Sequence, residues 1–416
     1  MSETRSRTNA PKPAGIARHG RLRSPSPWLA ALKFVGVAIV VVAVSAVSVV
    51  AIDGYRTVAA VKTFELPSQA DGVPPSIDAI PGGFDILIVG SDTGVGQGDL
   101  GEGRDAALND VNILLHVSAD HSNAVAVSFP RDLVVPIPSC TNPTTGKTSA
   151  AMSAQPINVA LSYGGVSCVA ATVEKLTGVT IDYAGLITFQ GVIEMSNAVG
   201  GVPVCLAEAI NDKYTGFNRP AGTSVLSGYD ALMFLRSRHG VGDGSDLTRI
   251  SSQQVFMSSL VRTLKSADTL GDPVKVYNIA NAALRNMELS EGLKSADTLV
   301  SIALALKDID LASVVFTQYP GSTGQPAGTP YAGKVKPNTA LGNKLFAKIL
   351  ADEPFALAKQ GDGSGSVLDP NATATPVDPS ATPDPSATAE APATDVEVLA
   401  GLRGQTAEAQ TCSVGR

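Results

Sequence analysis

The feature that most constrains the fold is a series of short apolar segments separated by amphipathic ones. Five segments have the length and composition of buried β-strands: FDILIVG at 84–90, VNILLHV at 111–117, AVAVSF at 124–129, YAGLITF at 183–189 and VPVCL at 202–206. Helical patterns lie between several of them, including 169–178 and 190–201. This alternation predicts an α/β fold, a three-layer α/β/α sandwich around a central mixed sheet.

The N-terminal part of the chain separates basic from apolar residues. Residues 1–33 contain seven Lys or Arg and one Glu, whereas residues 34–52 form a 19-residue run without a charge. A run of this length can cross a membrane as a helix, and a basic flank stays on the cytoplasmic side. We therefore expect a single-pass cell membrane protein with a cytoplasmic N-terminus and an extracellular body. A cleaved signal peptide is the alternative.

Composition divides the rest of the chain into four parts. Residues 53–80 have mostly helical patterns and end in a Pro-bearing linker, and residues 81–358 carry the patterns of one globular domain. From 359 to 396 the chain is rich in Pro, Ala, Thr, Ser and Asp, which is typical of a disordered tether. Residues 397–416 regain apolar character, so we expect this C-terminal tail to be fixed to the body.

Cysteine usage agrees with an extracellular location. The chain has four cysteines, Cys140, Cys168, Cys205 and Cys412, and none has the C-x-x-C spacing of a zinc or redox site. Two disulfides would allow three connectivities. We favour Cys140 with Cys168, because the first lies in a Pro-rich loop and the second begins a helical pattern. The alternative is buried, unpaired thiols.

The run FLRSRHGVGDGSDLTRISSQQ gathers arginines with acids and glutamines. On an extended segment, Arg236 and Arg238 would point to the same side. We expect Asp246 to be a helix N-cap and Arg249 and Gln253 to share one face of that helix. Guanidinium groups and a helix N-terminus both bind anions, so the run predicts a phosphate or pyrophosphate site.

Acidic residues at the ends of predicted strands form a second group. Asp92 follows the first strand, Asp110 precedes the second, and Arg131 and Asp132 follow the third. Two carboxylates at neighbouring strand ends can share a cation, and with phosphate they favour magnesium or manganese. Each residue has a simpler interpretation: the aspartates as turn or cap residues, and Arg131 with Asp132 as a surface ion pair.

In their order along the chain these segments resemble the LytR-CpsA-Psr family of cell-envelope glycopolymer transferases. The resemblance covers residues 81–258 and rests on ILIVGSDT, a strand that opens with Asp110, FPRD, NVALSYGG, the FLRSRHG run and DLTRISSQQ. It implies a membrane-anchored enzyme that moves a glycopolymer from a polyprenyl pyrophosphate carrier onto peptidoglycan.

The resemblance also implies roles for individual residues. Asp92 and Asp110 would hold Mg²⁺ (or Mn²⁺), and the pyrophosphate would be bound by Arg131, Arg236, Arg238, Arg249 and Gln253. The expected catalytic residues are Asp92, Asp110, Arg131, Arg236 and Arg238. The family commonly has an arginine two residues before the second acid, where this chain has Leu108. Arg104 is a candidate replacement.

These groups suggest a direct phosphoryl transfer. With charge on the phosphates neutralised, a sugar hydroxyl can attack the phosphorus next to the glycopolymer and expel polyprenyl phosphate, with hydrolysis of the pyrophosphate as a side activity. No covalent intermediate is required. Asp92, Asp132 and Asp246 are candidates for the general base. His239 adjoins the arginines but reads equally as an ordinary loop residue.

Two other classes of protein remain as alternatives. A noncatalytic protein that binds an anionic envelope polymer would use the same arginines but would not need paired aspartates. A membrane-bound transcription attenuator would need a cytoplasmic DNA-binding module, and the 33-residue basic tail is too short for a helix-turn-helix. We therefore expect no nucleic-acid partner, while the identity of the glycopolymer stays open.

Overall fold

The computed structural model consists of two compact units, residues 1–56 and 57–416. Within the first unit the structure describes residues 28, 31–38, 40, 41 and 45, and within the second it describes 61–66, 82–92, 107–266, 269, 272–372 and 396–416. In the first unit, residues 31–38, 40 and 41 are helical, and apolar side chains such as Phe34 and Val37 are exposed. Apart from residue 45, the rest of the predicted 34–52 span lies outside the described residues.

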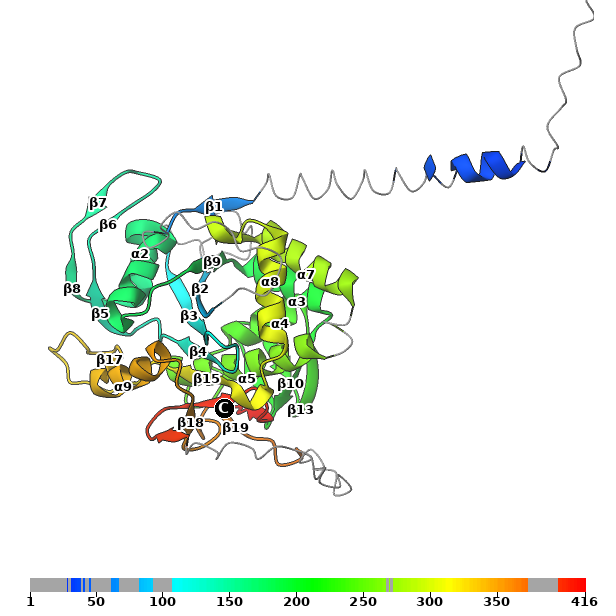
Figure 1. Ribbon diagram of the computed structural model, residues 1–416. Helices are drawn as coiled ribbons and strands as arrows, with labels where there is room; N and C mark the ends of the chain where they lie inside the picture. The colour runs from blue at the N-terminus through cyan, green and yellow to red at the C-terminus, as the bar shows by residue number, and fades with distance from the viewer. Residues whose placement is uncertain are drawn as a thin grey trace, which may run out of the picture. The chain divides into compact units, whose positions relative to one another are not determined.

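The second unit is built on an eight-stranded mixed sheet (Figure 1). In spatial order its strands are β1 (Lys62–Phe64), β14 (Met287–Ser290), β9 (Tyr183–Ile187), β2 (Phe84–Ser91), β3 (Asn109–Val117), β4 (Ala124–Ser128), β15 (Val314–Gln318) and β21 (Gly404–Thr406). The pairs β1/β14, β9/β2 and β4/β15 are parallel, and the other neighbours are antiparallel.

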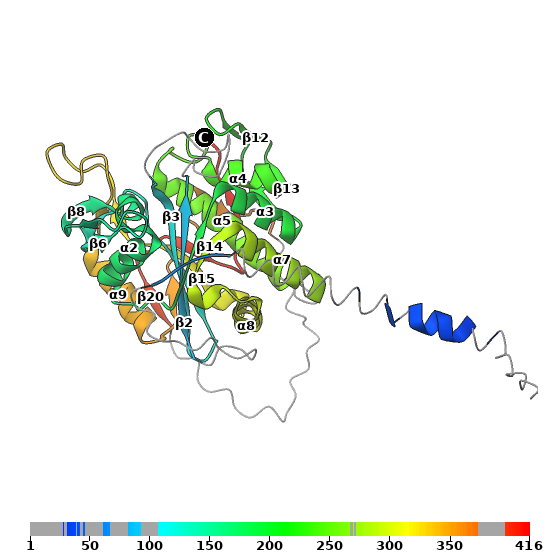
Figure 2. The ribbon, with the colours of Figure 1, turned by 90° about the horizontal axis from the view of Figure 1, so that it is seen from above.

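Helices cover both faces of this sheet (Figure 2). Leu87 and Val89 of β2 pack in a core with α2 (Ala160–Thr177) and α9 (Thr339–Leu350). Ile86 faces the opposite core, formed with α5 (Asp246–Lys265), α7 (Pro273–Asn286) and α8 (Ala296–Lys307). Because both faces are buried, the middle of β2, Ile86 to Val89, is a continuous apolar run instead of alternating with polar residues. The predicted helix–sheet–helix layering is thus present.

A second, smaller sheet packs beside the first. Its four strands are β13 (Gly222–Leu226), β10 (Val202–Leu206), β22 (Thr411–Ser413) and β19 (Ser366–Leu368). They share a core with α3 (Phe189–Val199), α4 (Gly228–Arg236) and α5. The segment VPVCL is therefore a strand, as predicted, but it belongs to this sheet and not to the central one.

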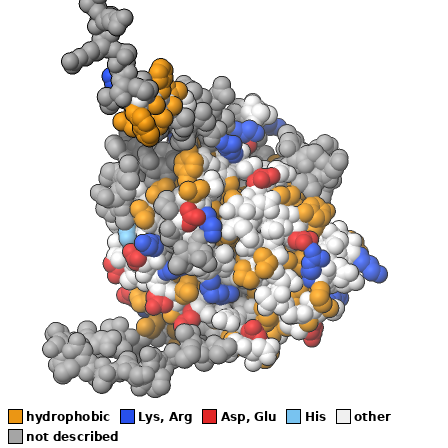
Figure 3. All heavy atoms as spheres, turned by 90° about the vertical axis from the view of Figure 1, so that its right-hand side faces the viewer, with side chains coloured by type: hydrophobic (Ala, Val, Ile, Leu, Met, Phe, Trp, Pro, Cys, Tyr) orange, Lys and Arg blue, Asp and Glu red, His pale blue; other side chains and the backbone are white. Residues whose placement is uncertain are grey.

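Short strand pairs complete the body. They are β5 (Val134–Ile137) with β8 (Met152–Pro156), β6 (Cys140–Thr141) with β7 (Thr148–Ser149), β11 (Ile210–Asp212) with β12 (Phe217–Arg219), β16 (Gly321–Ser322) with β17 (Lys336–Pro337), and β18 (Phe355–Leu357) with β20 (Glu397–Leu399). On the face shown in Figure 3, acidic and basic side chains are interspersed with apolar ones.

The body extends beyond the predicted boundaries at both ends. Residues 62–64, expected to be part of a helical stalk, form edge strand β1, because their backbone hydrogen bonds are made to β14. Residues 359–372, expected to belong to the disordered linker, include β19. The tail also folds as part of the body, since β21 closes the central sheet and β22 joins the smaller one.

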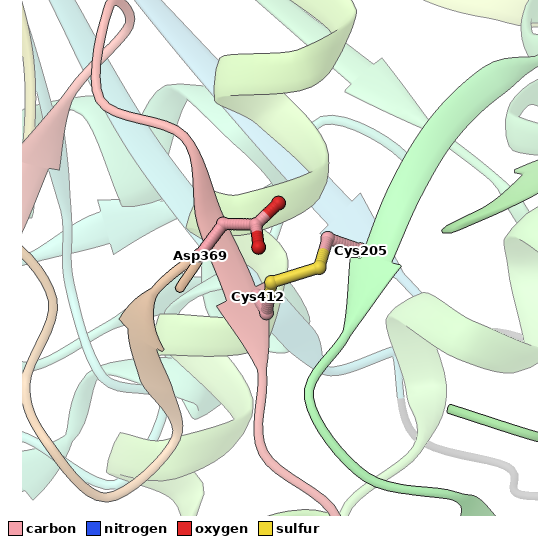
Figure 4. Close-up of side chains that lie close together, drawn as sticks. All are labelled: Cys205, Asp369 and Cys412. Carbon is pink, nitrogen blue, oxygen red and sulfur yellow. A yellow bond between two sulfur atoms is a disulfide. The ribbon is translucent and has the colours of Figure 1, made fainter. Parts of the chain in front are cut away.

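Both disulfides expected of an extracellular chain are formed, and the favoured pair is confirmed. Cys140 is bonded to Cys168, and Cys205 is bonded to Cys412. The second bond fixes the tail to β10. Asp369 lies beside this bond (Figure 4). These three residues have ligand-type atoms within 4.8 Å of one another, but sulfurs joined in a disulfide are not the thiolates that bind metals.

One helix among the described residues, Ile157–Thr177, is long and apolar enough to cross a membrane, and 61% of its apolar window is buried. Its side chains, including Val169 and Val173, lie in the core with β2. We therefore interpret this helix as a core element of the body.

Candidate phosphate and metal site

The predicted acidic residues lie together at one end of the central sheet. Asp92 directly follows β2, and Asp110 is the second residue of β3. Ser91 pairs with Asn109 across these two strands, so each aspartate lies one residue from the same pair. The turn after β4 carries Arg131, and the N-terminus of α5 lies at the same place through the contacts described next.

Arg131 connects three of the acids. Its Nη1 donates to Oδ1 of Asp110 at 2.7 Å, and its Nε lies 3.7 Å from Asp132 Oδ2 and 3.8 Å from Asp246 Oδ1. Burial opposes the charge of the guanidinium, but the three carboxylates outweigh this effect and raise the pKa of Arg131 above its ordinary value. Arg131 is therefore held as a cation among acidic groups and is more than a surface ion pair.

The first turn of α5 adds a second arginine. Arg249 Nη2 lies 2.6 Å from Asp246 Oδ1 and donates to the backbone O of Asp110 at 3.1 Å. Asp246 is not the N-cap that was predicted, because Ser245 has the extended backbone and its hydroxyl accepts from Thr248 N at 3.3 Å. Asp246 instead lies inside the helix, where its carboxylate is free to pair with Arg249.

Two buried N–H groups of this cluster have no hydrogen-bond acceptor among the described residues. They are Nε of Arg131 and Nε of Arg249. An unpaired buried donor costs about 1–3 kcal/mol, more for a charged group. Together with the positive end of the α5 dipole, they offer an incompletely filled set of donors to an anion.

The other predicted phosphate ligands lie on the elements that lead into α5. Arg236 is the last residue of α4, and its Cζ lies 4.3 Å from the centroid of the Phe189 ring. Arg238 donates from Nε to Gly244 O at 3.0 Å. The predicted extended segment is wrong for Arg236, because α4 continues to this residue.

Gln253 shares α5 with Arg249 as predicted, but its Nε2 donates to Leu235 O at 2.9 Å. This bond ties α5 to α4. The structure thus brings Asp110, Arg131, Asp246 and Arg249 into direct contact, whereas Arg236, Arg238 and Gln253 have other partners. The candidate Arg104 lies outside the described residues, and Leu108 contributes its backbone O to a bond from Ser91 Oγ at 2.8 Å.

Two residues near the site were missed by sequence reasoning. Lys334 Nζ lies 2.5 Å from Asp132 Oδ1. Asp132, one of the candidate general bases, is therefore ion-paired with Lys334. Asp212 is 1% exposed, and its carboxylate accepts the backbone N–H groups of Arg238 at 2.9 Å and Gly240 at 3.1 Å. Burial opposes its charge, but the backbone donors outweigh this and lower the pKa of Asp212. Its place in a turn ending in Thr-Gly was the available signal.

The donor set at the sheet end fits a small divalent cation. Mg²⁺ is commonly held by one or two carboxylates, with phosphate oxygens and water completing its shell. Asp92 and Asp110 supply two carboxylates on adjacent strands, and Asp92 is only 3% exposed. A buried carboxylate is stabilised by a neighbouring cation.

An apolar cavity lies farther along the same helix. It has a volume of about 280 Å³ and lies between the central sheet and α5, α7 and α8. Its walls include Ile88 and Ile113 of the strands that carry the aspartates, and Met257 and Val261 of α5. Met257 is eight residues beyond Arg249, about 12 Å along the helix axis. The strands β2 and β3 and the helix α5 thus extend from the polar site to the apolar cavity.

Comparisons with known proteins agree with these features. The LytR_cpsA_psr family model matches residues 59–344. The chain is 38% identical to the cell wall biosynthesis protein LcpA of Corynebacterium glutamicum over 148 residues, which are 36% of this chain and 28% of LcpA. It is 26% identical over 238 residues, 56% of this chain and 66% of the relative, to TagT of Bacillus subtilis, a polyisoprenyl-teichoic acid–peptidoglycan teichoic acid transferase.

Protein gbs0355 of Streptococcus agalactiae shares the fold, with a TM-score of 0.50, 21% identity, and coverage of 66% of this chain and 89% of that one. The matches with the curated relatives span 28% of LcpA and 46% of LcpB of Corynebacterium glutamicum. The family model, in contrast, covers more than half of this chain and includes every site residue described above. The chain therefore belongs to the LytR_cpsA_psr family.

Proposed function

We propose that this protein transfers a glycopolymer from a polyprenyl pyrophosphate carrier to a sugar hydroxyl of peptidoglycan and releases polyprenyl phosphate. The observation that carries the proposal is the pair of buried N–H groups, Nε of Arg131 and Nε of Arg249, beside carboxylates at the end of the sheet. Membership of a family whose relatives include a teichoic acid–peptidoglycan transferase supports it.

The arginines bind and orient the pyrophosphate in this proposal. Arg131 and Arg249 present N–H groups toward phosphate oxygens, and Arg238 adds positive charge from the loop before α5. Such preorganised donors stabilise the charge that develops on the phosphate oxygens as the acceptor oxygen attacks. Phosphoryl transfer needs little covalent help from a protein, so positioning and charge account for the catalysis.

Asp92 and Asp110 would hold a Mg²⁺ or Mn²⁺ ion. When bound, such an ion neutralises phosphate charge and favours departure of the polyprenyl phosphate. The acceptor hydroxyl loses its proton to a carboxylate of the site, for which Asp92, Asp132 and Asp246 are candidates. Water in place of the sugar hydroxyl would give hydrolysis of the carrier as a side activity.

The apolar cavity would hold part of the polyprenyl chain. Its lining is almost entirely apolar, and Lys265 is its one charged residue among those described. Burial of a hydrocarbon chain there is favourable by roughly 25 cal/mol per Å² of apolar surface removed from water. The ligand that fits the whole arrangement therefore has an anionic head and a long apolar tail.

We also propose that the basic tail lies in the cytoplasm, that residues 34–52 cross the membrane once, and that the body faces the envelope. Two disulfides in the body support an extracellular location, since disulfides persist in oxidising compartments. Protease added to intact spheroplasts should digest the body and spare residues 1–33. Protection of the body would reverse this orientation.

The experiment that tests the function uses the full chain in detergent micelles with a polyprenyl pyrophosphate that carries a short glycan. Transfer to a soluble peptidoglycan fragment, with release of polyprenyl phosphate that depends on Mg²⁺, is the expected result. Tight binding of the carrier without turnover under any metal condition would instead identify a noncatalytic polymer-binding protein.

A further inference from the structure

Two aromatic rings form an exposed stack beside the arginine loop. Tyr214 lies in the turn between β11 and β12, and 81% of it is exposed. Its ring centroid lies 4.1 Å from that of His239, with 33° between the ring planes. His239 directly follows Arg238 and is also exposed. One face of a tyrosine ring is thus supported by a neighbour in the loop that carries Arg238.

The backbone beneath this stack is fixed by Asp212. While Oδ2 of Asp212 accepts from Arg238 and Gly240, its Oδ1 accepts from Tyr214 N at 3.0 Å and Thr215 N at 3.4 Å. One carboxylate therefore joins the backbone of Tyr214 to the backbone of Arg238. The positions of the ring and of the arginine are set by a single buried group.

Close packing makes this connection rigid. A Cβ atom on Gly240 would lie 2.9 Å from Asp212 Cβ, so the loop approaches the turn as closely as glycine allows. Thr215 Oγ1 and Ser237 Oγ add a hydrogen bond of 3.0 Å between the same two segments. Figure 2 shows β12 and α4, which flank these segments, at the same end of the body. An exposed side chain on a fixed backbone loses little entropy when it binds a ligand.

We propose that Tyr214, supported by His239, is a saccharide subsite in which the tyrosine ring packs against the C–H face of a sugar ring. The inference rests on the proposed function, in which the first sugar of the donor is bonded directly to a phosphate and must lie beside the arginines. A sugar ring has an apolar C–H face and a polar rim, and a tyrosine offers a large, rigid, amphipathic surface at small entropic cost.

The sugar has two potential sources, the donor glycopolymer and the acceptor glycan. Both present the same C–H face, so the structure assigns the chemistry of the ligand and the experiment distinguishes its source. Tyr229 provides a matched control, because it is 56% exposed on α4 but makes no ring contact with the described residues.

The test compares Tyr214→Ala, Tyr214→Phe and Tyr229→Ala in the full chain. Donors are polyprenyl pyrophosphate with and without one N-acetylglucosamine residue, and the acceptor is a soluble peptidoglycan disaccharide. Loss of one aromatic contact predicts a rise in KM of roughly tenfold for Tyr214→Ala. A rise confined to the sugar-bearing donor identifies the donor sugar, and a rise confined to the acceptor identifies the acceptor sugar. Tyr214→Phe and Tyr229→Ala should match the wild type.

Two outcomes overturn the inference. The first is a Tyr214→Ala variant whose KM values for the sugar-bearing donor and for the acceptor are both unchanged. The second is an equal rise in KM for the sugar-free carrier, which would mean that Tyr214 acts only through the arginine loop. If the wild type turns over no carrier at all, the proposed function fails by itself. In that case saturation-transfer NMR with the disaccharide still decides the subsite. A signal lost in Tyr214→Ala and kept in Tyr229→Ala supports it, and a signal kept in both overturns it.

Discussion

Arg131 Nη1 donates a hydrogen bond to Asp110 Oδ1 at 2.7 Å, although Arg131 was expected to bind phosphate and Asp110 a metal ion. The pair joins the turn after β4 to the start of β3, so a residue proposed to bind phosphate and a residue proposed to bind the metal ion lie in one cluster. Each group keeps further capacity: the guanidinium has its buried Nε, and a carboxylate can accept several bonds.

Arg131→Lys should reduce turnover by roughly 100-fold or more while the melting temperature stays within a few degrees of the wild type. A lysine keeps the charge but loses the fork that can contact Asp110 and a phosphate together, and loss of one preorganised donor costs about that much. The measurement is kcat/KM for the lipid-linked donor. Arg219→Lys, at a half-exposed pair with Asp230, is the control and should have little effect. Equal activity of the two variants would return Arg131 to a structural role.

Asp92→Asn should abolish Mg²⁺-dependent turnover and leave the fold intact. The substitution preserves shape but removes the charge that a divalent cation needs from its ligand. Calorimetric titration of Mn²⁺ in the presence of the pyrophosphate carrier should show binding to the wild type and none to the variant. Full activity of Asp92→Asn, or of the wild type in excess chelator, would rule out the metal assignment.

Ala280→Leu should discriminate between carriers by the length of their polyprenyl chain. Ala280 lines the apolar cavity, so a larger side chain fills space that a long chain would use. KM should rise for long carriers and stay constant for those with one or two isoprene units. Ala282→Leu is the matched control, since Ala282 is on the same helix but does not line the cavity. If the KM of both variants is independent of the polyprenyl chain length, the cavity does not bind the lipid.

The free energy of unfolding should decrease as pH rises above 6.5, through the titration of His116. Its Nδ1 lies 3.1 Å from Asp85 Oδ1 and its Nε2 lies 3.0 Å from Asp352 Oδ1. Carboxylates only accept, so both ring nitrogens carry protons. Burial opposes this charge, but the two aspartates outweigh it and raise the pKa of His116 above 6.5.

Because the folded pKa is the higher one, the stabilisation is present in full below pH 6.5 and is lost as pH rises through the folded pKa. The slope reaches at most about 1.4 kcal/mol per pH unit for one proton. Chemical denaturation of the wild type and of His116→Gln between pH 6 and 9 measures it. His121→Asn, which suits the positive φ of that residue, should keep the wild-type slope. A slope that persists in His116→Gln would exclude this residue as its source.

The strands that carry the acids were predictable because they are apolar on both faces. Segments such as FDILIVG and AVAVSF coincide with β2 and β4 to within one residue. In contrast, β1 and β21 are three residues long and mostly polar. Their strand conformation comes from partners distant in the sequence, which periodicity does not reveal.

The site was predictable in its residue types but less so in its contacts. Asp110, Arg131 and Arg249 converge as the motifs implied, because each lies at the end of a well-defined strand or helix. The extended conformation expected at Arg236 was wrong, since α4 continues through this residue. The turn residues around Asp212 could be recognised in the sequence, but not its contact with Arg238, because that residue follows 26 positions later.

The tail has a consequence for biogenesis. Residues 404–413 supply β21 and β22, and Cys412 is bonded to a cysteine 207 positions earlier. Both sheets therefore remain incomplete until residues 404–413 have been synthesised and have paired with strands formed by much earlier parts of the sequence. Folding intermediates that lack β21 and β22 would expose unpaired strand edges, so the pairing of these two strands is the step that completes the native state.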